Sequence, residues 1–493
     1  MTRQPEWAGL VATALLGTDR RPFPGGPAAL LDQAAVATVQ RRAGRLPEPP
    51  GALPEPAPAD PRPAPPEAAV HRLAALLAAQ RAGAAARGPA NLTELLPQWL
   101  GAARAAGYRA PVELLPELLA AARARSELRE DAVALAGPPG RWLAERNREW
   151  AYVLRTCAAE TEEDEKDGTR IWEEGLFSER VTHLTRLRRR DPAAALRLLS
   201  STWPTERAED RLLFLDALQE RLSLADEPFL EAALSDRGRN VRATAAELLS
   251  TLPGSALAAR MARRAASAVR LERGRVTVRP PTVCDAEMQR DGIAPRSPTG
   301  RGERAWWLAE IVAATPLDVW VPGLAPTPAE VLRLPVADGW RDELHEAWAR
   351  AAVRQGDAAW ARALLEAFTR PVPAARLLLT LPPAERAAWT ARFVASHGLT
   401  DAFQALTACA VPWSEKLALA VLGAMARAGS AGAYPWSCSG VIAAAERALP
   451  PTVAAEVERL AAEAGATTSP WGETFTRVAA TLRVREAMLA ELR

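Results

Sequence analysis

The stretch FLEAALSDRGRNVRATAAELL, residues 229–249, decides the fold class of this 493-residue chain. Apolar residues dominate its first part, and a short polar turn follows at 236–240. In the second part, apolar side chains recur at spacings of four, seven and eight residues, at Val241, Ala245, Leu248 and Leu249. Such spacings place one apolar stripe along a helix. The stretch therefore predicts two helices joined by a short turn, which is a helical hairpin.

Part of this hairpin resembles a known repeat. LSD at 234–236, VR at 241–242 and AA at 245–246 are similar to the L-x-D…V-R-x-x-A-A signature of HEAT repeats. The resemblance implies that Asp236 and Arg242 stabilise the repeat, and we expect the two residues to share one hydrogen-bonded network. One hairpin cannot bury both of its faces, so further hairpins must stack on it. We predict an all-α, HEAT-like α-solenoid of helical hairpins with a small β-hairpin and loop insertion.

Helical patterns extend from this repeat in both directions along the chain. Asp191-Pro192, for example, is a typical helix start, because an N-cap residue is followed by a first-turn proline. The patterns and their interruptions predict seven segments. These are an N-terminal helical segment (1–46), a Pro-rich linker (47–66), a helical region (67–159), an acidic hinge (160–168), a HEAT-like repeat region (169–268), a hairpin and loop insertion (269–303) and a C-terminal helical repeat region (304–493).

The linker is predicted from its prolines, which make up ten of the twenty residues from 47 to 66. This density excludes a regular helix and favours polyproline II, a semi-rigid spacer of about 3.1 Å per residue. The P-x-x-P spacings Pro47 to Pro50 and Pro58 to Pro61 leave docking on a partner's aromatic groove as the alternative.

The hinge is predicted from a cluster of carboxylates that repel one another unless they are solvated. The cluster consists of Glu160, Glu162, Glu163, Asp164, Glu165 and Asp167. It lacks the glycine turn of an EF-hand loop, so we expect a solvated loop and no calcium site.

Residues 269–278 predict a β-hairpin with a glycine near its turn, and a Pro-, Gly- and Arg-rich loop follows to Glu303. Connections of this length are functional or disordered. We expect the loop at 276–303 to contact a protein partner and to be largely dispensable for folding. The candidate contact residues are Cys284, Asp285, Glu287, Asp291, Arg296 and Arg301.

An arginine cluster supports an alternative, nucleic-acid binding on a concave solenoid face. Its candidate residues are Arg260, Arg263, Arg264, Arg270, Arg273 and Arg275. Two observations weaken this alternative. The 61 basic and 59 acidic side chains leave a net charge of only +2, and arginine replaces lysine everywhere except at Lys166 and Lys416. The arginine content therefore indicates GC-rich coding more than phosphate recognition.

No stretch of the sequence carries a catalytic constellation. The four histidines are scattered, and the chain lacks a G-x-x-x-x-G-K-[ST] phosphate loop and a G-x-S-x-G nucleophile motif. We therefore expect no enzymatic activity and no cofactor; a hydrolase using the carboxylates of the 276–303 loop is the least favoured alternative. Four scattered cysteines and the lack of a signal-like N-terminus favour the cytoplasm. No apolar run approaches the ~20 residues of a membrane span.

Four stretches carry a second resemblance that covers most of the chain. They are WAGLVATALLGTDRRP (7–22), GRWLAERNREW (140–150), 226–249 and GERAWWLAEIVAATPLDVW (302–320). Together they resemble an uncharacterised bacterial domain-of-unknown-function family of helical-repeat proteins. Members of that family are often encoded beside SWIM zinc-finger proteins and MoxR-type ATPases with von Willebrand factor A partners. The resemblance implies a protein–protein interaction scaffold in a cytoplasmic multi-protein assembly, with these proteins as expected partners.

Overall fold

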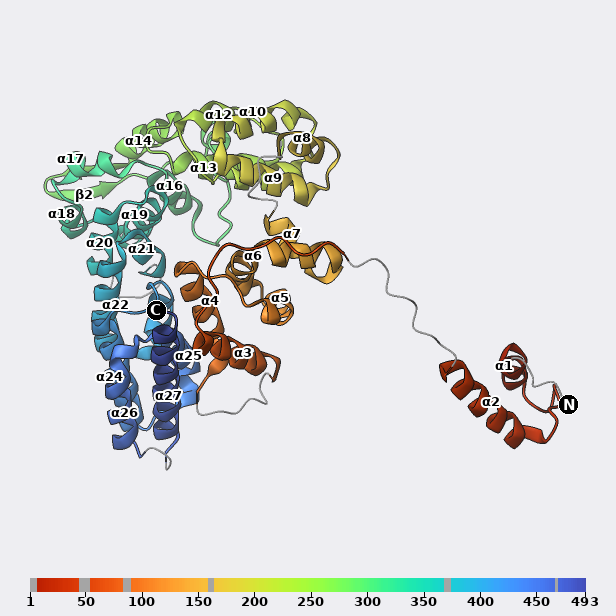
Figure 1. Cartoon of the computed structure of the whole chain (residues 1–493). Coiled ribbons are helices and arrows are strands. Elements are labelled where there is room, and N and C mark those ends of the chain that lie inside the picture. The colour runs from red at the N-terminus through yellow and green to blue at the C-terminus, as the bar shows by residue number, and fades with distance from the viewer. Residues whose placement is uncertain (1–6, 44–53, 83–89, 158–163, 368–373, 466–468) are drawn as a thin grey trace. The chain divides into compact units, whose positions relative to one another are not determined.

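A computed structural model describes residues 7–43, 54–82, 90–157, 164–367, 374–465 and 469–493 (Figure 1). Over these residues the chain forms 27 α-helices and one two-stranded antiparallel sheet. The all-α prediction with one small hairpin is confirmed. Within the described ranges, every helix is too short or too polar to cross a membrane. The chain divides into two compact units, Met1–Pro58 and Ala59–Arg493.

The first unit is a pair of helices, α1 (Trp7–Leu16) and α2 (Gly26–Ala43), that pack against each other. Gly17 follows the last residue of α1, with φ at 81°. Glycine adopts this left-handed conformation without a side-chain clash. The guanidinium of Arg41 lies 5.1 Å from the centre of the Trp7 ring, which ties the end of α2 to the start of α1.

The second unit begins with five helices that share one hydrophobic cluster. They are α3 (Glu67–Ala82), α4 (Leu96–Ala105), α5 (Leu115–Ala124), α6 (Arg129–Arg146) and α7 (Ala151–Cys157). Leucines and Trp99 from these helices are fully buried in the cluster. Met488 and Leu492, from the C-terminal end of the chain, are buried in it as well. Residues more than 300 positions apart in sequence therefore form one core.

The Pro-rich segment is only partly a spacer. Residues 47–53 lie outside the described part of the chain, but Asp60 to Pro66 pack onto the second unit. Arg62 donates hydrogen bonds to the carbonyls of Ala134 and Leu135 at 2.7 and 3.2 Å, and its guanidinium pairs with Asp60. The prolines exclude helix as predicted, yet the C-terminal end of the segment is anchored because its backbone and Arg62 find partners on the α6 side.

The central part of the second unit contains the predicted repeat region. Its helices are α8 (Asp164–Glu174), α9 (Phe177–Arg190), α10 (Pro192–Thr202), α11 (Ala208–Ala217), α12 (Glu227–Ala233), α13 (Arg239–Ser250), α14 (Ala256–Ala268), α15 (Ala286–Arg290), α16 (Glu303–Ala313), α17 (Trp320–Leu324), α18 (Pro328–Arg333), α19 (Arg341–Gln355), α20 (Ala358–Ala367) and α21 (Ala374–Thr380). The strands are β1 (Val269–Glu272) and β2 (Arg275–Val278). Asp191 caps α10 as predicted, because its carboxylate accepts the backbone N–H of Ala194 at 2.9 Å.

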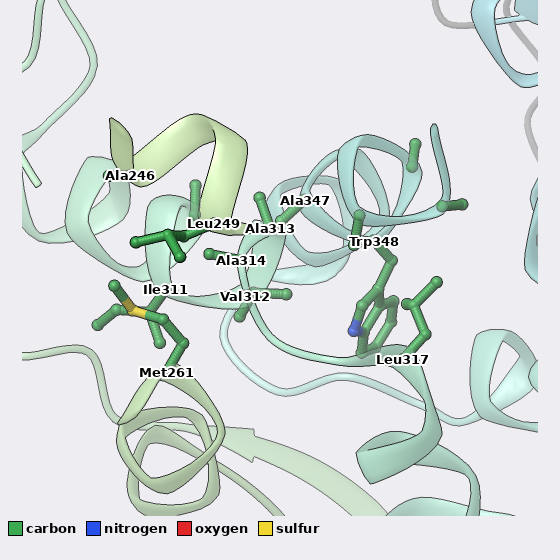
Figure 2. Packing of buried hydrophobic residues seen from close by; sticks show 14 of the residues in the cluster. Ala246, Leu249, Met261, Ile311, Val312, Ala313, Ala314, Leu317, Ala347 and Trp348 are labelled. Carbon is green, nitrogen blue, oxygen red and sulfur yellow. The ribbon is translucent and has the colours of Figure 1, made fainter. Parts of the chain in front are cut away.

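One continuous hydrophobic cluster runs through these helices. Figure 2 shows α16 at its centre: Ile311 faces Met261 and Leu249 on one side, and Val312 lies toward Trp348 on the other. Trp348 makes further ring contacts with Trp320 and Trp360, at centroid distances of 5.7 and 5.6 Å. The abundant tryptophans thus fill the space between packed helices, as their number indicates.

The acidic hinge differs from its prediction. Glu160, Glu162 and Glu163 lie outside the described residues, but helix α8 already begins at Asp164. The second half of the predicted loop is therefore the first turn of a helix.

His345 on α19 gives the core a pH-sensitive group. Its side chain is buried beside Trp348, with the two ring centres 5.9 Å apart. Burial, together with the charge of Arg341, lowers the pKa of His345 from 6.5 to about 4. Between these two values the unfolded chain binds a proton that the folded chain does not, so the free energy of unfolding must fall as the pH falls.

We therefore expect this one histidine to account for roughly 3 kcal/mol of stability lost between pH 6.5 and pH 4. The measurement is urea unfolding of the wild type and of His345→Phe across this pH range. Carboxylates titrate in both proteins, so the comparison isolates the histidine. The variant should show the shallower decline, and parallel curves would contradict the prediction.

The last six helices form the third cluster and return to the start of the unit. They are α22 (Pro383–His397), α23 (Leu399–Thr407), α24 (Glu415–Ser430), α25 (Ser439–Ala448), α26 (Ala454–Glu463) and α27 (Pro470–Glu491). Arg72 on α3 pairs with Glu491 on α27 through two hydrogen bonds of 2.6 and 3.2 Å. Asn91 donates to the buried carboxylate of Glu446 at 2.8 Å, and this carboxylate also pairs with Arg477. The first and last helices of the second unit are therefore in contact.

The repeat hairpin forms as predicted, with α12 and α13 packed on each other across the turn. Arg242 and Asp236 both hold this turn, but their side chains do not bond to each other. Arg242 donates to the backbone carbonyls of Asp236 and Arg237 at 2.8 and 3.1 Å. The carboxylate of Asp236 instead pairs with Arg211 on α11 at 2.5 Å and accepts the N–H of Gly238. Direct side-chain coupling therefore belongs to the Arg211–Asp236 pair.

A second charged pair, which the sequence did not reveal, lies fully inside the same region. The side chains of Arg188 on α9 and Asp226 are 0% and 2% exposed, and their ion pair measures 2.7 Å. Arg188 also donates to four backbone carbonyls at 3.0 to 3.2 Å, those of Pro192, Leu218, Glu220 and Arg221. It thereby holds the turn between α11 and α12 against the α9–α10 hairpin.

Candidate functional site

The hairpin and loop insertion are part of the core of the second unit. Strands β1 and β2 pair from Val269↔Val278 to Glu272↔Arg275, which leaves a two-residue turn at Arg273 and Gly274. Both turn residues have positive φ, 54° and 74°, which suits the twist of a two-residue hairpin. Val276 also exchanges backbone hydrogen bonds of 2.9 Å with Pro335 and Ala337. The hairpin is therefore fixed to the chain on its C-terminal side.

The prediction that the 276–303 loop is dispensable for folding is wrong. Cys284, Met288 and Ile293 are buried in the central hydrophobic cluster, and residues 286–290 form helix α15. The indole N–H groups of Trp306 and Trp307 donate to the carbonyls of Ala294 and Pro295, both at 3.2 Å. Apolar residues that are sparse in sequence thus converge on one side of the segment, and packing against α16 orders it.

A pocket of about 560 Å³ lies between this segment and helices α13, α14 and α16. Residues 289–296 form one wall, and Arg354 of α19 reaches the pocket from a distant part of the chain. Gly292 allows the wall to approach α13: its φ is 91°, and a Cβ there would lie 2.4 Å from the Cβ of Ala246. This close approach needs a residue without a side chain. The volume is within the range of small-molecule sites.

Two of the three carboxylates that line the pocket are neutralised by arginines outside the lining. The side chain of Asp291 is 1% exposed and accepts hydrogen bonds from Arg260 at 2.8 and 3.0 Å and from Arg264 at 2.6 Å. Glu310 pairs with Arg350 at 2.5 Å. Glu247 is the one lining carboxylate that makes no ion pair with a described residue.

Four guanidinium groups line the same pocket, those of Arg239, Arg242, Arg296 and Arg354. None of the four pairs with a carboxylate within the described part of the chain. Arg354 makes one long hydrogen bond, 3.4 Å, to the carbonyl of Ala313. Burial lowers the pKa of Arg354, and the negative charges of Glu310 and Glu247 oppose this shift. The pocket therefore has an excess of positive charge and one poorly solvated cation.

The structure brings together three of the residues that the sequence singled out. Arg242, Asp291 and Arg296 line the pocket. The buried Asp291 and Cys284 cannot contact a partner directly; burial also raises the pKa of the Cys284 thiol. The other predicted contact residues, Asp285, Glu287 and Arg301, are exposed outside the pocket.

The predicted arginine face is divided between the interior and the surface. Arg260 and Arg264 share a face of α14 as expected, but both form ion pairs with Asp291. Arg260 also pairs with Glu231 at 3.0 Å. The other members, Arg263, Arg270, Arg273 and Arg275, are exposed. A groove of six free guanidinium groups, which the nucleic-acid alternative requires, does not form.

Sequence reasoning missed Arg354, Trp306 and Glu310 as pocket residues. They lie within ordinary amphipathic helices, and only helix packing places them beside residues 289–296. The described residues include no group of three or more His, Cys, Asp or Glu that could hold a metal ion. Cys284, Cys409 and Cys438 are buried free thiols. None of the residues that line the pocket is a histidine or a cysteine.

Comparison with known proteins identifies the family to which the chain belongs. A model of the DUF5691 family, described as a family of unknown function, matches residues 9–492. The chain belongs to the DUF5691 family. The match spans both units of the DUF5691 fold described above, so the N-terminal helix pair and the pocket-bearing unit belong to one family architecture. No curated protein and no solved structure matches the chain.

The N-terminal helix pair of this DUF5691 protein carries the second candidate surface. Among the residues of this unit that the structure describes, the buried apolar side chains are those of Leu10 and Leu30. Trp7, Val11 and Leu15 recur every fourth residue on one face of α1, and they are 38%, 39% and 83% exposed. On α2 the exposed apolar side chains are Leu31, Val36 and Val39. We refer to these exposed side chains as the apolar face of α1 and α2; within it, Arg41 partly covers the Trp7 ring.

Proposed function

We propose that this DUF5691 protein is a non-enzymatic protein–protein interaction scaffold, built as a HEAT-like α-solenoid and acting in a cytoplasmic multi-protein assembly. The observation that carries the proposal is the apolar face of α1 and α2. Exposed apolar side chains grouped on one pair of helices are typical of interaction sites, since their contact with water is unfavourable. A pair of short helices with two buried leucines also lacks the core that a small domain needs for independent stability.

The helix packing of the second unit supports the solenoid part of the proposal. From α9 to α21, the main helix contacts join helices that are one to three apart in sequence, with pairs such as α12 with α13, α14 with α16 and α16 with α19. Stacked helical hairpins produce this pattern. The contact of α3 with α27 is an exception to it, since it joins the two ends of the unit.

The partners that the family resemblance implies are a MoxR-type ATPase, a von Willebrand factor A protein and a SWIM zinc-finger protein. They are the first proteins to test, each purified and mixed with the full chain. The exposed apolar face predicts that at least one of them, or a protein identified by affinity purification from native cytoplasm, binds through α1 and α2.

The decisive variant is Leu15→Glu with Leu31→Glu, which places two charges on the apolar face. Both residues are more than two-thirds exposed, so folding should be preserved. We expect the affinity of the purified partner to fall at least about tenfold, since a buried unpaired charge costs well above 1.4 kcal/mol. Gln33→Glu adds a charge to the same helix outside the apolar set and is the matched control. Unchanged affinity in the double variant would contradict the proposal.

A further inference from the structure

The pocket beside α16 has a property that a scaffold role does not explain. Several arginines near this pocket are paired with carboxylates, as Arg260, Arg264 and Arg350 are. These three arginines are not part of the pocket lining, and they form ion pairs with two of its carboxylates, Asp291 and Glu310. The arginines that face the cavity are left without a carboxylate partner among the described residues.

The two ends of the cavity differ in exposure. Arg239 and Arg296 are exposed, whereas Arg354 is only partly exposed and burial lowers its pKa. A poorly solvated guanidinium with one long hydrogen bond gains most from an anionic ligand, because charge-assisted hydrogen bonds strengthen in a low-dielectric site. Arginine also presents several donors in one plane, which match the oxygens of a carboxylate or phosphate group.

Part of the remaining lining is apolar. Met261, Ile293 and Trp306 contribute apolar surface, and the indole N–H of Trp306 is fixed by the carbonyl of Ala294. Convergent charged groups beside apolar side chains are typical of a small-molecule site. The short distance between the 292 backbone and α13 keeps this wall rigid.

We infer that this pocket is a binding site for a small anionic ligand, one that carries a carboxylate or phosphate group and an apolar body. The anionic group binds Arg354, with Arg296 and Arg239 attracting it at the rim. The apolar body lies against Trp306 and Ile293. The inference does not depend on the partner surface of α1 and α2.

The test uses the full chain and isothermal titration calorimetry with two probes, citrate and inorganic pyrophosphate. Citrate supplies carboxylates and pyrophosphate supplies phosphates, so the two titrations distinguish the two chemistries. Binding of at least one probe is expected, weakened at least about tenfold by Arg354→Gln, since loss of one charge-assisted hydrogen-bonded pair has this effect. Arg296→Gln should weaken it less, because that side chain is exposed.

Arg273→Gln is the matched control: it removes an exposed arginine at the tip of the β-hairpin, outside the pocket. Binding should be unchanged in this variant. Equal weakening by Arg273→Gln and Arg354→Gln would show only non-specific attraction to surface arginines and would overturn the inference. Lack of binding of both probes up to about 10 mM, well above the affinity of a single multidentate anion site, would overturn it too. If Arg354→Gln disturbs the circular dichroism spectrum, the Arg296→Gln comparison with Arg273→Gln decides.

Discussion

The variant Arg188→Ala is expected to lose about 3 to 5 kcal/mol of the free energy of unfolding, among the largest effects of any single substitution in this protein. The native side chain is fully buried and makes six hydrogen bonds, two of them to Asp226. Its removal leaves the Asp226 carboxylate buried without a cation. Four backbone carbonyls also lose this donor, three of them at the turn between α11 and α12 and the fourth at Pro192, the first residue of α10.

Arg189→Ala is the matched control, since it removes the neighbouring arginine on the same helix. Arg189 is 66% exposed and pairs with Glu220 at the surface, so its loss should cost about 0 to 1 kcal/mol. Urea unfolding of both variants, followed by circular dichroism, measures the difference. Similar urea midpoints for the two variants would contradict the conclusion that the buried Arg188 ion pair stabilises this region.

The double variant Arg188→Met with Asp226→Leu refines this test. It removes both charges and leaves apolar side chains of comparable size, so no buried ion remains without a partner. We expect it to be more stable than Arg188→Ala alone, because the largest cost of the single substitution is the orphaned carboxylate. A double variant less stable than the single one would show that packing dominates over charge at this site.

Replacing residues 282–300 by a short Gly/Ser bridge is expected to abolish cooperative unfolding of the central cluster or to lower its stability severely. The exchange removes Met288 and Ile293 from the core, and each buried side chain of this size contributes about 1.5 to 3 kcal/mol. It also removes Asp291, the carboxylate between Arg260 and Arg264, and the acceptors of two tryptophan N–H groups.

The control keeps the length of the segment and changes only exposed side chains, as in Arg296→Ser with Thr299→Ser. Exposed substitutions of this kind usually alter stability by less than about 0.5 kcal/mol. Thermal unfolding followed by circular dichroism separates the two proteins. If the shortened chain unfolds as cooperatively as the control, the segment is not part of the core.

The repeat stretch at 229–249 shows how far local sequence can go. The spacing of its apolar residues predicts two helices and their turn, and α12 and α13 appear at those positions. Asp191 as an N-cap, Gly17 as a helix end and Gly274 in the hairpin turn follow in the same way. Each depends on backbone conformation or on hydrogen bonds within a few residues, and such interactions are encoded by neighbouring side chains.

The arginines show what local sequence cannot predict, namely which charged side chains are buried and with which residues they pair. Arg188, Arg189 and Arg190 are identical in sequence, yet only Arg188 is buried. Its position four residues after the buried Leu184 places it on the apolar face of α9, and this was the one signal that could have identified it. The carboxylate that pairs with it is 38 residues away, so no local pattern specifies the pair.

The sequence by itself therefore determined the all-α class, the helix starts and ends and the β-hairpin, because these follow from local conformational preferences and apolar periodicity. Tertiary structure alone decided which charges are buried in pairs, that the 276–303 segment belongs to the core, and that Arg354 and Trp306 meet residues 289–296 in one pocket. The physical reason is that burial and ion pairing depend on which distant helices pack together. That choice is made by the summed contacts of the whole unit and not by any one stretch.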